Sequence, residues 1–407
     1  MRFALAIIVL ASLAACGHGL TGGYVAPPVA ANSTPIVIDG GPQSLAFGSL
    51  NAPYVTVTVC MPGTSSCQTI DHVLLDTGST GLRIVASVLP ATFNLPQSNA
   101  ATGNTPLWEC LKFRNAYSWG SVRTADVKVA NGLATSQPIQ LIGDPAEPTA
   151  NSDCTSTITS TGPVNLLSQN TVNELSANGI LGVNAFQYDC PACTNTANIF
   201  PGAYYSCAAV GGCVNSAVAL PAQVQNPLYN FQTDNNGIAI VLPAIAASGQ
   251  LNTAGTLILG ISTQPNNQLG SAAVVPLNTL GYFTTTYNGV QLPDSYIDSG
   301  SAYLYFNGAL APCATQTGYY CPATIQTLQA TNQLSGGATG TVSFSVDNYE
   351  TLSNNNPTFN ALANVAGTTN GSTRSFDWGL PFFYGRTVFV GFENRSAGQN
   401  LGPFFAY

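Results

Sequence analysis

Hydrophobic and polar residues alternate with a period of two over many short stretches of the chain. The clearest alternation is Tyr-Val-Thr-Val-Thr-Val at residues 54–59, and short apolar runs recur at residues 73–75, 238–242, 256–259 and 387–390. Because successive side chains of a β-strand point to opposite faces, this period predicts strands with one buried face. Glycine and proline interrupt the chain throughout, and helical patterns are short. We therefore predict a mostly β fold that begins at about residue 36.

Two eleven-residue segments, 74–84 and 296–306, form an internal repeat. Both read apolar, apolar, Asp, Thr or Ser, Gly, Ser, which places Asp76 and Asp298 at equivalent positions 222 residues apart. Composition gives about 0.05 chance matches per chain to Asp-[Ser/Thr]-Gly-[Ser/Thr], so a chance pair is on the order of one in a thousand. The repeat predicts two lobes related by pseudo-two-fold symmetry, each with one acidic loop, and a boundary near residue 245.

The N-terminus has the parts of an export signal. A positive start precedes an apolar run at residues 3–13 that is too short to cross a bilayer, and Leu-Ala-Ala-Cys follows at 13–16. This ending resembles the lipobox of bacterial lipoproteins, which implies a signal peptide at 1–15 and a lipid on Cys16. An ordinary signal peptide with an incidental cysteine is the alternative. Residues 16–35, rich in Gly, Pro and Ala, are then a lipidated tether.

The same resemblance predicts where the chain resides. Gly17 stands where an Asp often retains lipoproteins in the inner membrane, which favours the outer membrane, facing the periplasm or the cell surface. No later segment is long and apolar enough for a transmembrane helix. We therefore expect an exported bacterial lipoprotein that meets the membrane through its N-terminal lipid only. Residues 36–245 then form the N-terminal lobe and residues 246–407 the C-terminal lobe.

Charge and histidine content exclude several classes of function. Only 6% of residues are charged, with 9 Lys and Arg against 17 Asp and Glu, and the net charge is −8. Nucleic acid is not an expected partner, because phosphate binding needs clustered bases. The two histidines are His18, in the tether, and His72. A Ser-His-Asp triad, a Cys-His pair or a His-bound catalytic zinc would have to use one of them, so these mechanisms are disfavoured.

The cysteines predict disulfides. Of the eleven, ten remain once Cys16 is set aside, an even number that fits an oxidising compartment. A turn-rich stretch between two strand-like runs predicts a bridge across a hairpin at Cys60–Cys67. Cys110–Cys154 and Cys313–Cys321 are proposed as further pairings. The remaining four form a cluster that begins with C-x-x-C, for which we favour two bridges of open connectivity over a zinc site: Cys190, Cys193, Cys207 and Cys213.

The repeated motif has a chemical logic. An aspartate after two apolar residues is carried into the interior, and the glycine two residues later allows close approach of another loop. Hydroxyls next to the aspartate can satisfy its oxygens and the neighbouring backbone. If the two loops meet, Asp76 and Asp298 share one site and cannot both ionise easily, so one keeps a proton. Such a pair can activate water for attack on a carbonyl.

From about residue 36 to its end, the chain resembles the pepsin-like aspartic peptidases. The resemblance implies a two-lobed acid protease fold with Asp76 and Asp298 as the catalytic pair. It also implies that Thr77 and Ser299 form an interlocked hydrogen-bond grip between the loops. The other motif residues would support the aspartates, with the two serines bonded to the outer carboxyl oxygens: Gly78, Ser79, Gly300 and Ser301.

Two further elements of that family have counterparts here. An apolar-apolar-Gly segment packs beneath each Asp loop, and residues 180–182, Ile-Leu-Gly, match it in the first lobe. In the second lobe Trp-Gly at 378–379 resembles it, but Asp377 replaces an apolar residue. The flap, a hairpin with a tyrosine over the cleft, matches Tyr117, with Trp119 as the alternative aromatic.

One position departs from the family in a way that bears on substrates. Arg83 stands seven residues after Asp76, where the family often has a Trp bonded to the flap tyrosine. A cation at the cleft wall would favour acidic or polar substrate side chains. The cysteine-rich insertion at about 190–213 is expected either to shape the cleft or to cover it.

These observations predict an aspartic endopeptidase. The expected partner is an extended peptide or protein substrate laid between the lobes, the expected state is a monomer, and the resemblance implies neither a metal nor an organic cofactor. The alternative is a non-catalytic pepsin-fold surface lipoprotein that binds peptide or protein. A glycosidase with two carboxylates is disfavoured, because that chemistry needs no repeated Asp-Thr/Ser-Gly loop.

Overall fold

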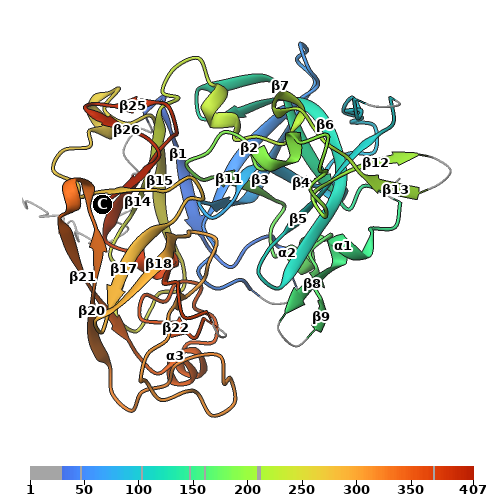
Figure 1. Cartoon of the computed structure of the whole chain (residues 1–407). Helices are drawn as coiled ribbons and strands as arrows, with labels where there is room; N and C mark the ends of the chain where they lie inside the picture. The colour runs from blue at the N-terminus through green and yellow to red at the C-terminus, as the bar shows by residue number, and fades with distance from the viewer. Residues whose placement is uncertain are drawn as a thin grey trace, which may run out of the picture.

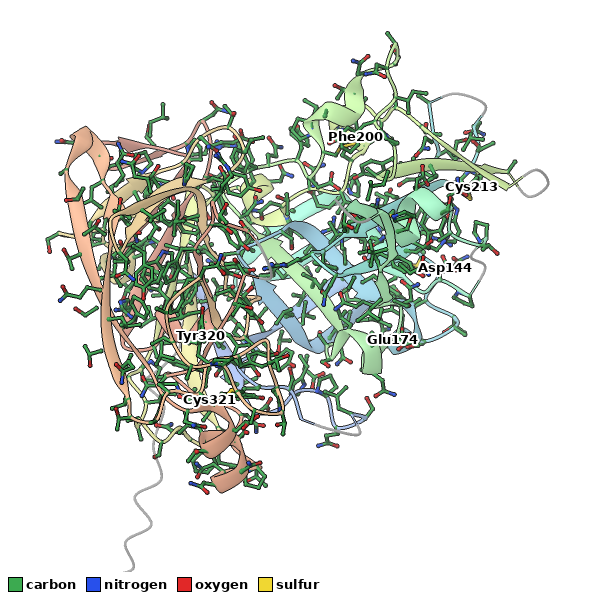
Figure 2. All side chains as sticks on the ribbon, turned by 60° about the horizontal axis from the view of Figure 1, so that its bottom comes forward. Asp144, Glu174, Phe200, Cys213, Tyr320 and Cys321 are labelled. Carbon is green, nitrogen blue, oxygen red and sulfur yellow. A yellow bond between two sulfur atoms is a disulfide. The ribbon has the colours of Figure 1, made fainter. Side chains whose placement is uncertain are left out.

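The structure is a computed structural model that describes residues 30–45, 48–101, 104–145, 148–159, 162–208, 212–369 and 372–407. The predicted signal peptide, Cys16 and His18 lie outside the described residues. Within these ranges no helix is long and apolar enough to cross a membrane. The described chain is mostly β, as predicted, and forms two lobes that lie side by side (Figure 1). In Figure 2, Glu174 and Cys213 label one lobe and Cys321 labels the other.

A central antiparallel group of strands joins the lobes. In spatial order its members are β1 (Ser33–Ile38), β15 (Thr253–Leu259), β14 (Gly237–Leu242), β24 (Arg386–Gly391), β27 (Phe404–Ala406) and β16 (Val274–Pro276). Figure 1 shows β1, in blue, beside β15 between the lobes. Strand β1 begins at Ser33, so residues 33–35 belong to the fold and not to the tether. The boundary near residue 245 stays a prediction, since strands from both sides of it share this group.

The N-terminal lobe continues the same sheet. Its strands are β2 (Tyr54–Cys60), β3 (Cys67–Asp76), β4 (Thr80–Val85), β5 (Leu107–Lys112), β6 (Ala116–Val129), β7 (Gly132–Ile142), β10 (Leu167–Ser168), β11 (Gly179–Val183), β12 (Tyr204–Ala208) and β13 (Gly212–Asn215). They run in the order β13-β12-β5-β6-β7-β4-β11-β3-β2, and β6 also pairs with β2, which curves the sheet into a barrel-like wall. The apolar alternation at 54–59 lies on β2, where Val55, Val57 and Val59 are buried.

The C-terminal lobe has a second sheet. In spatial order its strands are β21 (Thr339–Val346), β20 (Gln326–Gln333), β17 (Phe283–Tyr287), β18 (Val290–Ile297), β23 (Asp377–Trp378), β19 (Leu304–Tyr305) and β22 (Ala366–Gly367). Two small hairpins complete the described strands: β8 (Ser156–Thr159) with β9 (Gly162–Asn165), and β25 (Ser396–Ala397) with β26 (Asn400–Leu401).

Helices are short, as the sequence pattern predicts. The α-helices are α1 (Ser152–Thr155), α2 (Val172–Leu175) and α3 (Tyr349–Asn355). Single 3-10 turns occur at Ala86–Val88, Pro191–Thr194, Leu220–Ala222, Pro227–Asn230, Pro265–Asn267, Ser335–Gly337 and Leu380–Phe382. The largest apolar cluster runs through both lobes. The hydrophobic effect therefore holds the lobes together as one body.

The same three-strand arrangement occurs once in each lobe and carries the Asp loop. Strand β11 lies between β3, to which it is parallel, and β4, to which it is antiparallel. Strand β23 lies between β18 and β19 in the same two senses. The Asp76 loop joins β3 to β4, and the Asp298 loop joins β18 to β19. This repeated topology confirms the predicted two-lobed fold with pseudo-two-fold symmetry.

The Ile-Leu-Gly element at 180–182 and its counterpart at 377–379 each lie beneath an Asp loop, at a distance that only glycine permits. A Cβ atom on Gly182 would lie 2.8 Å from the Ser79 Oγ atom, and one on Gly379 would lie 2.0 Å from the Tyr303 carbonyl oxygen. The second element therefore occupies its predicted place despite Asp377. Beneath it, the rings of Phe376 and Trp378 stack with centroids 4.1 Å apart.

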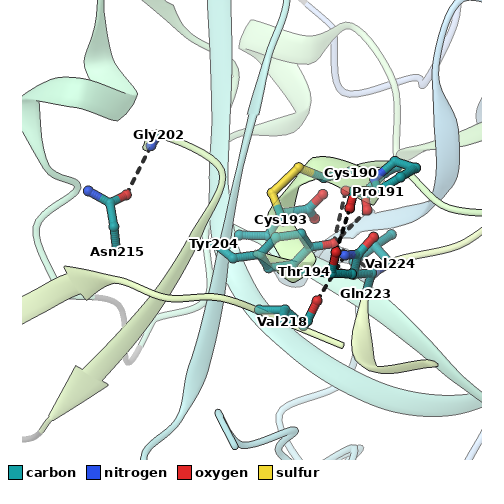
Figure 3. Close-up of a disulfide and its surroundings, with 12 residues drawn as sticks. Cys190, Pro191, Cys193, Thr194, Gly202, Tyr204, Asn215, Val218, Gln223 and Val224 are labelled. Atoms are coloured by element: carbon teal, nitrogen blue, oxygen red, sulfur yellow. Dashed lines mark hydrogen bonds between the residues drawn. A yellow bond between two sulfur atoms is a disulfide. The ribbon is translucent and has the colours of Figure 1, made fainter. Parts of the chain in front are cut away.

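Five disulfides join the ten remaining cysteines. The three predicted bridges are present: Cys60–Cys67, Cys110–Cys154 and Cys313–Cys321. The cluster pairs as Cys190–Cys193 and Cys207–Cys213, which settles the connectivity that spacing left open. Figure 3 shows the Cys190–Cys193 bridge beside the Tyr204 side chain, whose hydroxyl accepts a hydrogen bond from the Val224 backbone.

Candidate active site

A cleft of about 870 Å³ between the lobes contains both predicted catalytic aspartates. Asp76 is the last residue of β3, and Asp298 directly follows β18. Side chains from both lobes line the cleft, among them Tyr54, Phe113, Asn184, Tyr282, Tyr296 and Tyr305. The two loops that are far apart in sequence therefore meet at one open site.

Thr77 and Ser299 lock the two loops together. The Thr77 hydroxyl donates to the Ile297 carbonyl over 2.9 Å and accepts from the Ser299 backbone N–H over 2.9 Å. The Ser299 hydroxyl donates to the Leu75 carbonyl over 2.6 Å and accepts from the Thr77 backbone N–H over 3.0 Å. Both side chains are buried, so water does not compete for these bonds. The structure therefore brings together the predicted grip residues.

Each aspartate has the same pair of hydrogen-bond donors. The Asp76 Oδ1 atom accepts from the Gly78 N–H over 2.8 Å, and its Oδ2 atom accepts from the Ser79 hydroxyl. In the other loop the Gly300 N–H donates to Asp298 Oδ1 and the Ser301 hydroxyl donates to Asp298 Oδ2, each over 2.8 Å. Donors of this kind fix the orientation of a carboxyl group and stabilise its charge.

The motif glycines let the two carboxyl groups approach each other. A Cβ atom on Gly78 would lie 2.7 Å from the Asp298 Cγ atom, and one on Gly300 would lie 2.6 Å from the Asp76 Oδ1 atom. Each carboxyl therefore packs against the glycine of the opposite loop, and any side chain there would displace it. This is the close approach that the glycine of the motif predicts.

Enclosure of these groups changes their acidity. Burial raises the pKa of Asp298 well above its ordinary value, and the negative charges of Asp76 and Asp377 raise it further. Asp298 keeps part of its surface open to the cleft, while Asp377 is only 4% exposed. Burial also raises the pKa of Asp377 to about 8, although a hydrogen bond with Ser301 and the charge of Arg114 oppose the rise.

Asp377 belongs to the site, a role that the sequence did not assign to it. Its Oδ2 atom lies 2.8 Å from the Ser301 Oγ atom, which also contacts Asp298. The sequence marked Asp377 only as a departure from an apolar position. A charged residue in an otherwise apolar segment beneath an Asp loop was the available signal.

Arg83 does not lie at the cleft wall, which corrects the expectation drawn from its position after Asp76. Its side chain is fully buried and donates to the Thr80 carbonyl over 2.6 Å. It forms ion pairs with Glu109 and, at 3.4 Å, with Asp189. Two carboxyl groups in a protein interior require such a counter-charge, so Arg83 serves the lobe's interior and offers no surface to a substrate.

The predicted flap hairpin exists, but Tyr117 does not face the cleft. The hairpin joins β5 to β6, and its turn residues, Phe113, Arg114 and Asn115, line the cleft. Tyr117 and Trp119 lie on another face, since alternate residues of a strand share a face. Trp119 there packs against Tyr205 with ring centroids 5.0 Å apart.

The cysteine-rich insertion lies at the edge of the flap hairpin and away from the cleft. Its strand β12 pairs with β5, and β13 extends the sheet beyond it. The insertion therefore widens the sheet along the edge of the flap hairpin, and Tyr205 of β12 contributes the ring that packs against Trp119. None of the described residues between 190 and 213 lines the cleft.

His72 lies apart from the carboxyl pair. Its Nε2 atom is 3.2 Å from Asp39 Oδ2, and its Nδ1 atom is 3.3 Å from Asp71 Oδ2. It is absent from the residues that line the described cleft. A triad that uses this histidine has no support in the site geometry.

The repeated three-strand topology and the gripped Asp loops define the fold of the pepsin-like aspartic proteinases. The family model described as "Protein of unknown function (DUF3443)" matches residues 28–407, and the chain belongs to this family. No curated protein matches the chain. One similar solved structure is the crystal structure of aspartic proteinase from Irpex lacteus, with 14% identity, coverage of 92% of this chain and 96% of that chain, and a TM-score of 0.46. The family description names no activity, so the chemistry has to come from the residues of the site.

Proposed function

We propose that the chain is an aspartic endopeptidase that hydrolyses peptide bonds with a water molecule activated between Asp76 and Asp298. The observation that carries the proposal is the matched donor set of the two carboxyl groups, each bonded to a glycine N–H and a serine hydroxyl. Peptide binding alone would not need two enclosed acids with the same support. Two such acids in contact share one proton, which is the state that activates water.

The donors and the raised pKa of Asp298 assign the two roles. Asp298 keeps the shared proton, because burial and the charge of Asp76 disfavour its ionised form. Asp76 is then the anion and takes a proton from the attacking water. Asp298 donates its hydrogen bond to the carbonyl oxygen of the substrate, where negative charge develops. The protons belong to the pair, so its activity follows two macroscopic pKa values.

An extended peptide is the substrate that this cleft accommodates. The cleft is open and is lined from both lobes, with the flap turn at Phe113, Arg114 and Asn115 on one wall. An extended backbone presents its N–H and C=O groups along such a groove, and pockets receive alternate side chains. No metal or organic cofactor takes part in this scheme.

Cleavage of an unbiased peptide library tests the proposal. The purified protein is incubated from acidic to neutral pH beside Asp76→Asn and Asp298→Asn, with and without a statine-type inhibitor. Each substitution should lower kcat/KM by at least about 10³-fold while circular dichroism stays unchanged. Asp294→Asn is the matched control, since Asp294 lies on β18 but pairs with Arg374 at the surface.

Two results would decide against an enzyme. The proposal fails if the wild type cleaves nothing at any pH, or if cleavage survives both substitutions. Peptide binding without cleavage, measured by calorimetry with library fragments, would instead support the non-catalytic binding protein.

We further propose that the chain is exported and anchored by a lipid on Cys16. The five disulfides support export, because such bridges persist in oxidising compartments. Mass spectrometry of the native N-terminus tests the anchor. A diacylated cysteine at the first position is the expected result, and an unmodified N-terminus elsewhere contradicts it.

A further inference from the structure

Asp377 stands where the symmetry of the fold places an apolar residue. Ile180 in β11 pairs with Leu74, two residues before Asp76. Asp377 in β23 pairs with Tyr296, two residues before Asp298. The two lobes therefore put an isoleucine and an aspartate at equivalent points beneath their loops. The difference makes the site a group of three carboxyls instead of two.

One hydroxyl connects the third carboxyl to the catalytic pair. The Ser301 Oγ atom lies 2.8 Å from Asp298 Oδ2 and 2.8 Å from Asp377 Oδ2. A serine hydroxyl carries one proton and can donate to only one of these oxygens. The other carboxyl must therefore donate to Ser301, and to do so it must itself be protonated. The equivalent Ser79 meets no such conflict, because it donates to Asp76.

The surroundings of Asp377 favour the protonated form. Its side chain is almost fully buried, and its Oδ1 atom has no hydrogen-bond partner among the described residues. No described ion pair includes it, and the cation that acts on it, Arg114, sits at the exposed flap turn. An ionised carboxylate in such a place would leave an oxygen uncompensated, whereas a carboxylic acid carries no charge to compensate.

The hydrogen bonds then have one direction at neutral pH. Asp377 donates through Oδ2 to Ser301, and Ser301 donates to Asp298 Oδ2. The inner oxygen of Asp298 accepts from the Gly300 N–H and has a second lone pair to hold the proton shared with Asp76. When Asp377 ionises, the Ser301 hydroxyl turns toward it, and a negative charge appears beside Asp298.

We propose that Asp377 is a positioning residue of the catalytic pair, which orients Ser301 and, on ionising, makes Asp298 retain its proton to higher pH. The inference rests on the proposed peptidase function. Its physical basis is the shared Ser301 hydroxyl, 2.8 Å from both carboxyl groups: once ionised, Asp377 draws this hydrogen bond away from Asp298 and places a negative charge beside it. The alkaline limb of activity, where the pair loses its last proton, should therefore lie at higher pH than it would without this carboxyl.

The other groups that face Asp377 do not reverse this sign. Tyr296 on β18 and Tyr305 on β19 pair with it in register, and hydrogen bonding by Tyr296 lowers the pKa of Asp377 by less than burial raises it. Burial raises the pKa of both phenols, so they stay neutral. Asp76 adds negative charge on the far side of Asp298. Arg114 favours the ionised form of Asp377, but its charge is exposed and screened by salt.

The pH dependence of kcat/KM tests the proposal in Asp377→Asn and Asp377→Ile. The first keeps the shape but cannot ionise, and the second restores the residue of the other lobe. Both should move the alkaline limb to lower pH by about one unit. Asp294→Asn, which removes an exposed carboxyl of the same sheet, should leave the limb in place. A merely structural role would lower kcat without moving the limb, and an unmoved limb in both variants would overturn the proposal.

A second readout does not require cleavage. The Asp377 carboxyl is followed by ¹³C NMR of aspartate-labelled protein and identified by its loss in Asp377→Asn. Its titration should centre near pH 8. A midpoint near the ordinary value for aspartate would overturn the inference even in an active enzyme. If the wild type cleaves nothing, the proposed function fails, while a midpoint near 8 still upholds the protonated Asp377.

Discussion

Two groups of enclosed carboxyls, one around Arg83 in the N-terminal lobe and one around the Asp loops of the cleft, differ in that only the first encloses a cation. In the lobe, Glu109 and Asp189 lie against the fully buried Arg83. Tyr204 also donates to Asp189 over 2.8 Å. Burial and the charge of Glu109 raise the pKa of Asp189, and the charge of Arg83 opposes that rise.

The cleft group has no such counter-ion. No described ion pair includes Asp76, Asp298 or Asp377, and Arg114 is at the exposed flap turn. Protons must therefore neutralise this group where a guanidinium neutralises the other. Buried carboxyls that are paired with a fixed cation stabilise the packing of the lobe around them. Those that depend on protons can exchange them, and proton exchange is what peptide hydrolysis needs.

The largest expected effect is that of the Asp377 carboxyl, in the cleft group, on the unfolding free energy of the protein. The folded-state pKa of Asp377 is raised from 3.8 to about 8, so folding favours the protonated acid. That advantage is complete below pH 3.8, decreases as pH rises between the two pKa values, and is lost once pH passes 8. The unfolding free energy of the wild type should therefore fall relative to Asp377→Asn by on the order of 5 kcal/mol between these pH values. Urea unfolding at several pH values measures it, and parallel curves would contradict the comparison.

Removing the Arg83 cation should destabilise the buried group that it forms with Glu109 and Asp189. Arg83→Met leaves Glu109 and Asp189 in the interior without a counter-charge, and we expect a loss of about 3–5 kcal/mol in unfolding free energy. The loss should be greater at pH 8 than at pH 4, because acid neutralises the carboxyls. Arg374→Met is the control: its pair with Asp294 is exposed and is worth less than about 1 kcal/mol. Equal losses in the two variants, measured by urea unfolding, would show that Arg83 is not a structural counter-ion.

A smaller effect is expected from the uncharged grip. Thr77→Val removes a hydroxyl that bonds both Ile297 and Ser299, and it leaves two buried backbone groups unpaired. We expect a loss of about 2–3 kcal/mol, nearly independent of pH, together with reduced kcat. Thr58→Val removes a hydroxyl that bonds Thr69 at the surface and should cost much less. If the loss of stability in Thr77→Val, followed by thermal unfolding, depended strongly on pH, the grip would not act as an uncharged contact.

The smallest effect should follow from the flap cation. The charge of Arg114 lowers the pKa of Asp377, so Arg114→Ala should raise that pKa further, by less than about one unit. High salt should abolish the difference between variant and wild type, because an exposed charge is screened. The ¹³C titration of Asp377 at low and high salt measures it. A shift that persists in high salt would place Arg114 closer to the buried group than the flap geometry does.

Much of the fold and the centre of the site could be predicted because their signals are local. The period of two marks the strands, and each Asp-Thr/Ser-Gly-Ser loop carries its own donors within three residues of its aspartate. A turn-rich stretch likewise marked the Cys60–Cys67 bridge. Where symmetry repeats a local pattern, the pattern also predicts that the loops meet, as Thr77 and Ser299 do.

The missed assignments depend on segments far apart in the chain. Arg83 is buried because Glu109 and Asp189 converge on it from positions 26 and 106 residues away. The face of Tyr117 was misplaced because the side chains that pack on that side of the flap come from distant segments, such as Tyr205 of β12 beside Trp119. Asp377 joins the site through Ser301, 76 residues earlier. The alternation along a strand specifies which of its side chains share a face, but not which distant segment packs against that face.

The sequence by itself therefore determined the β architecture, the two Asp loops and most disulfide pairs. Only the tertiary structure decided which face of each strand is covered and which charges are enclosed together. The reason is physical: alternation along a strand is a property of the local backbone, whereas burial and the pKa of a carboxyl depend on everything that packs around it.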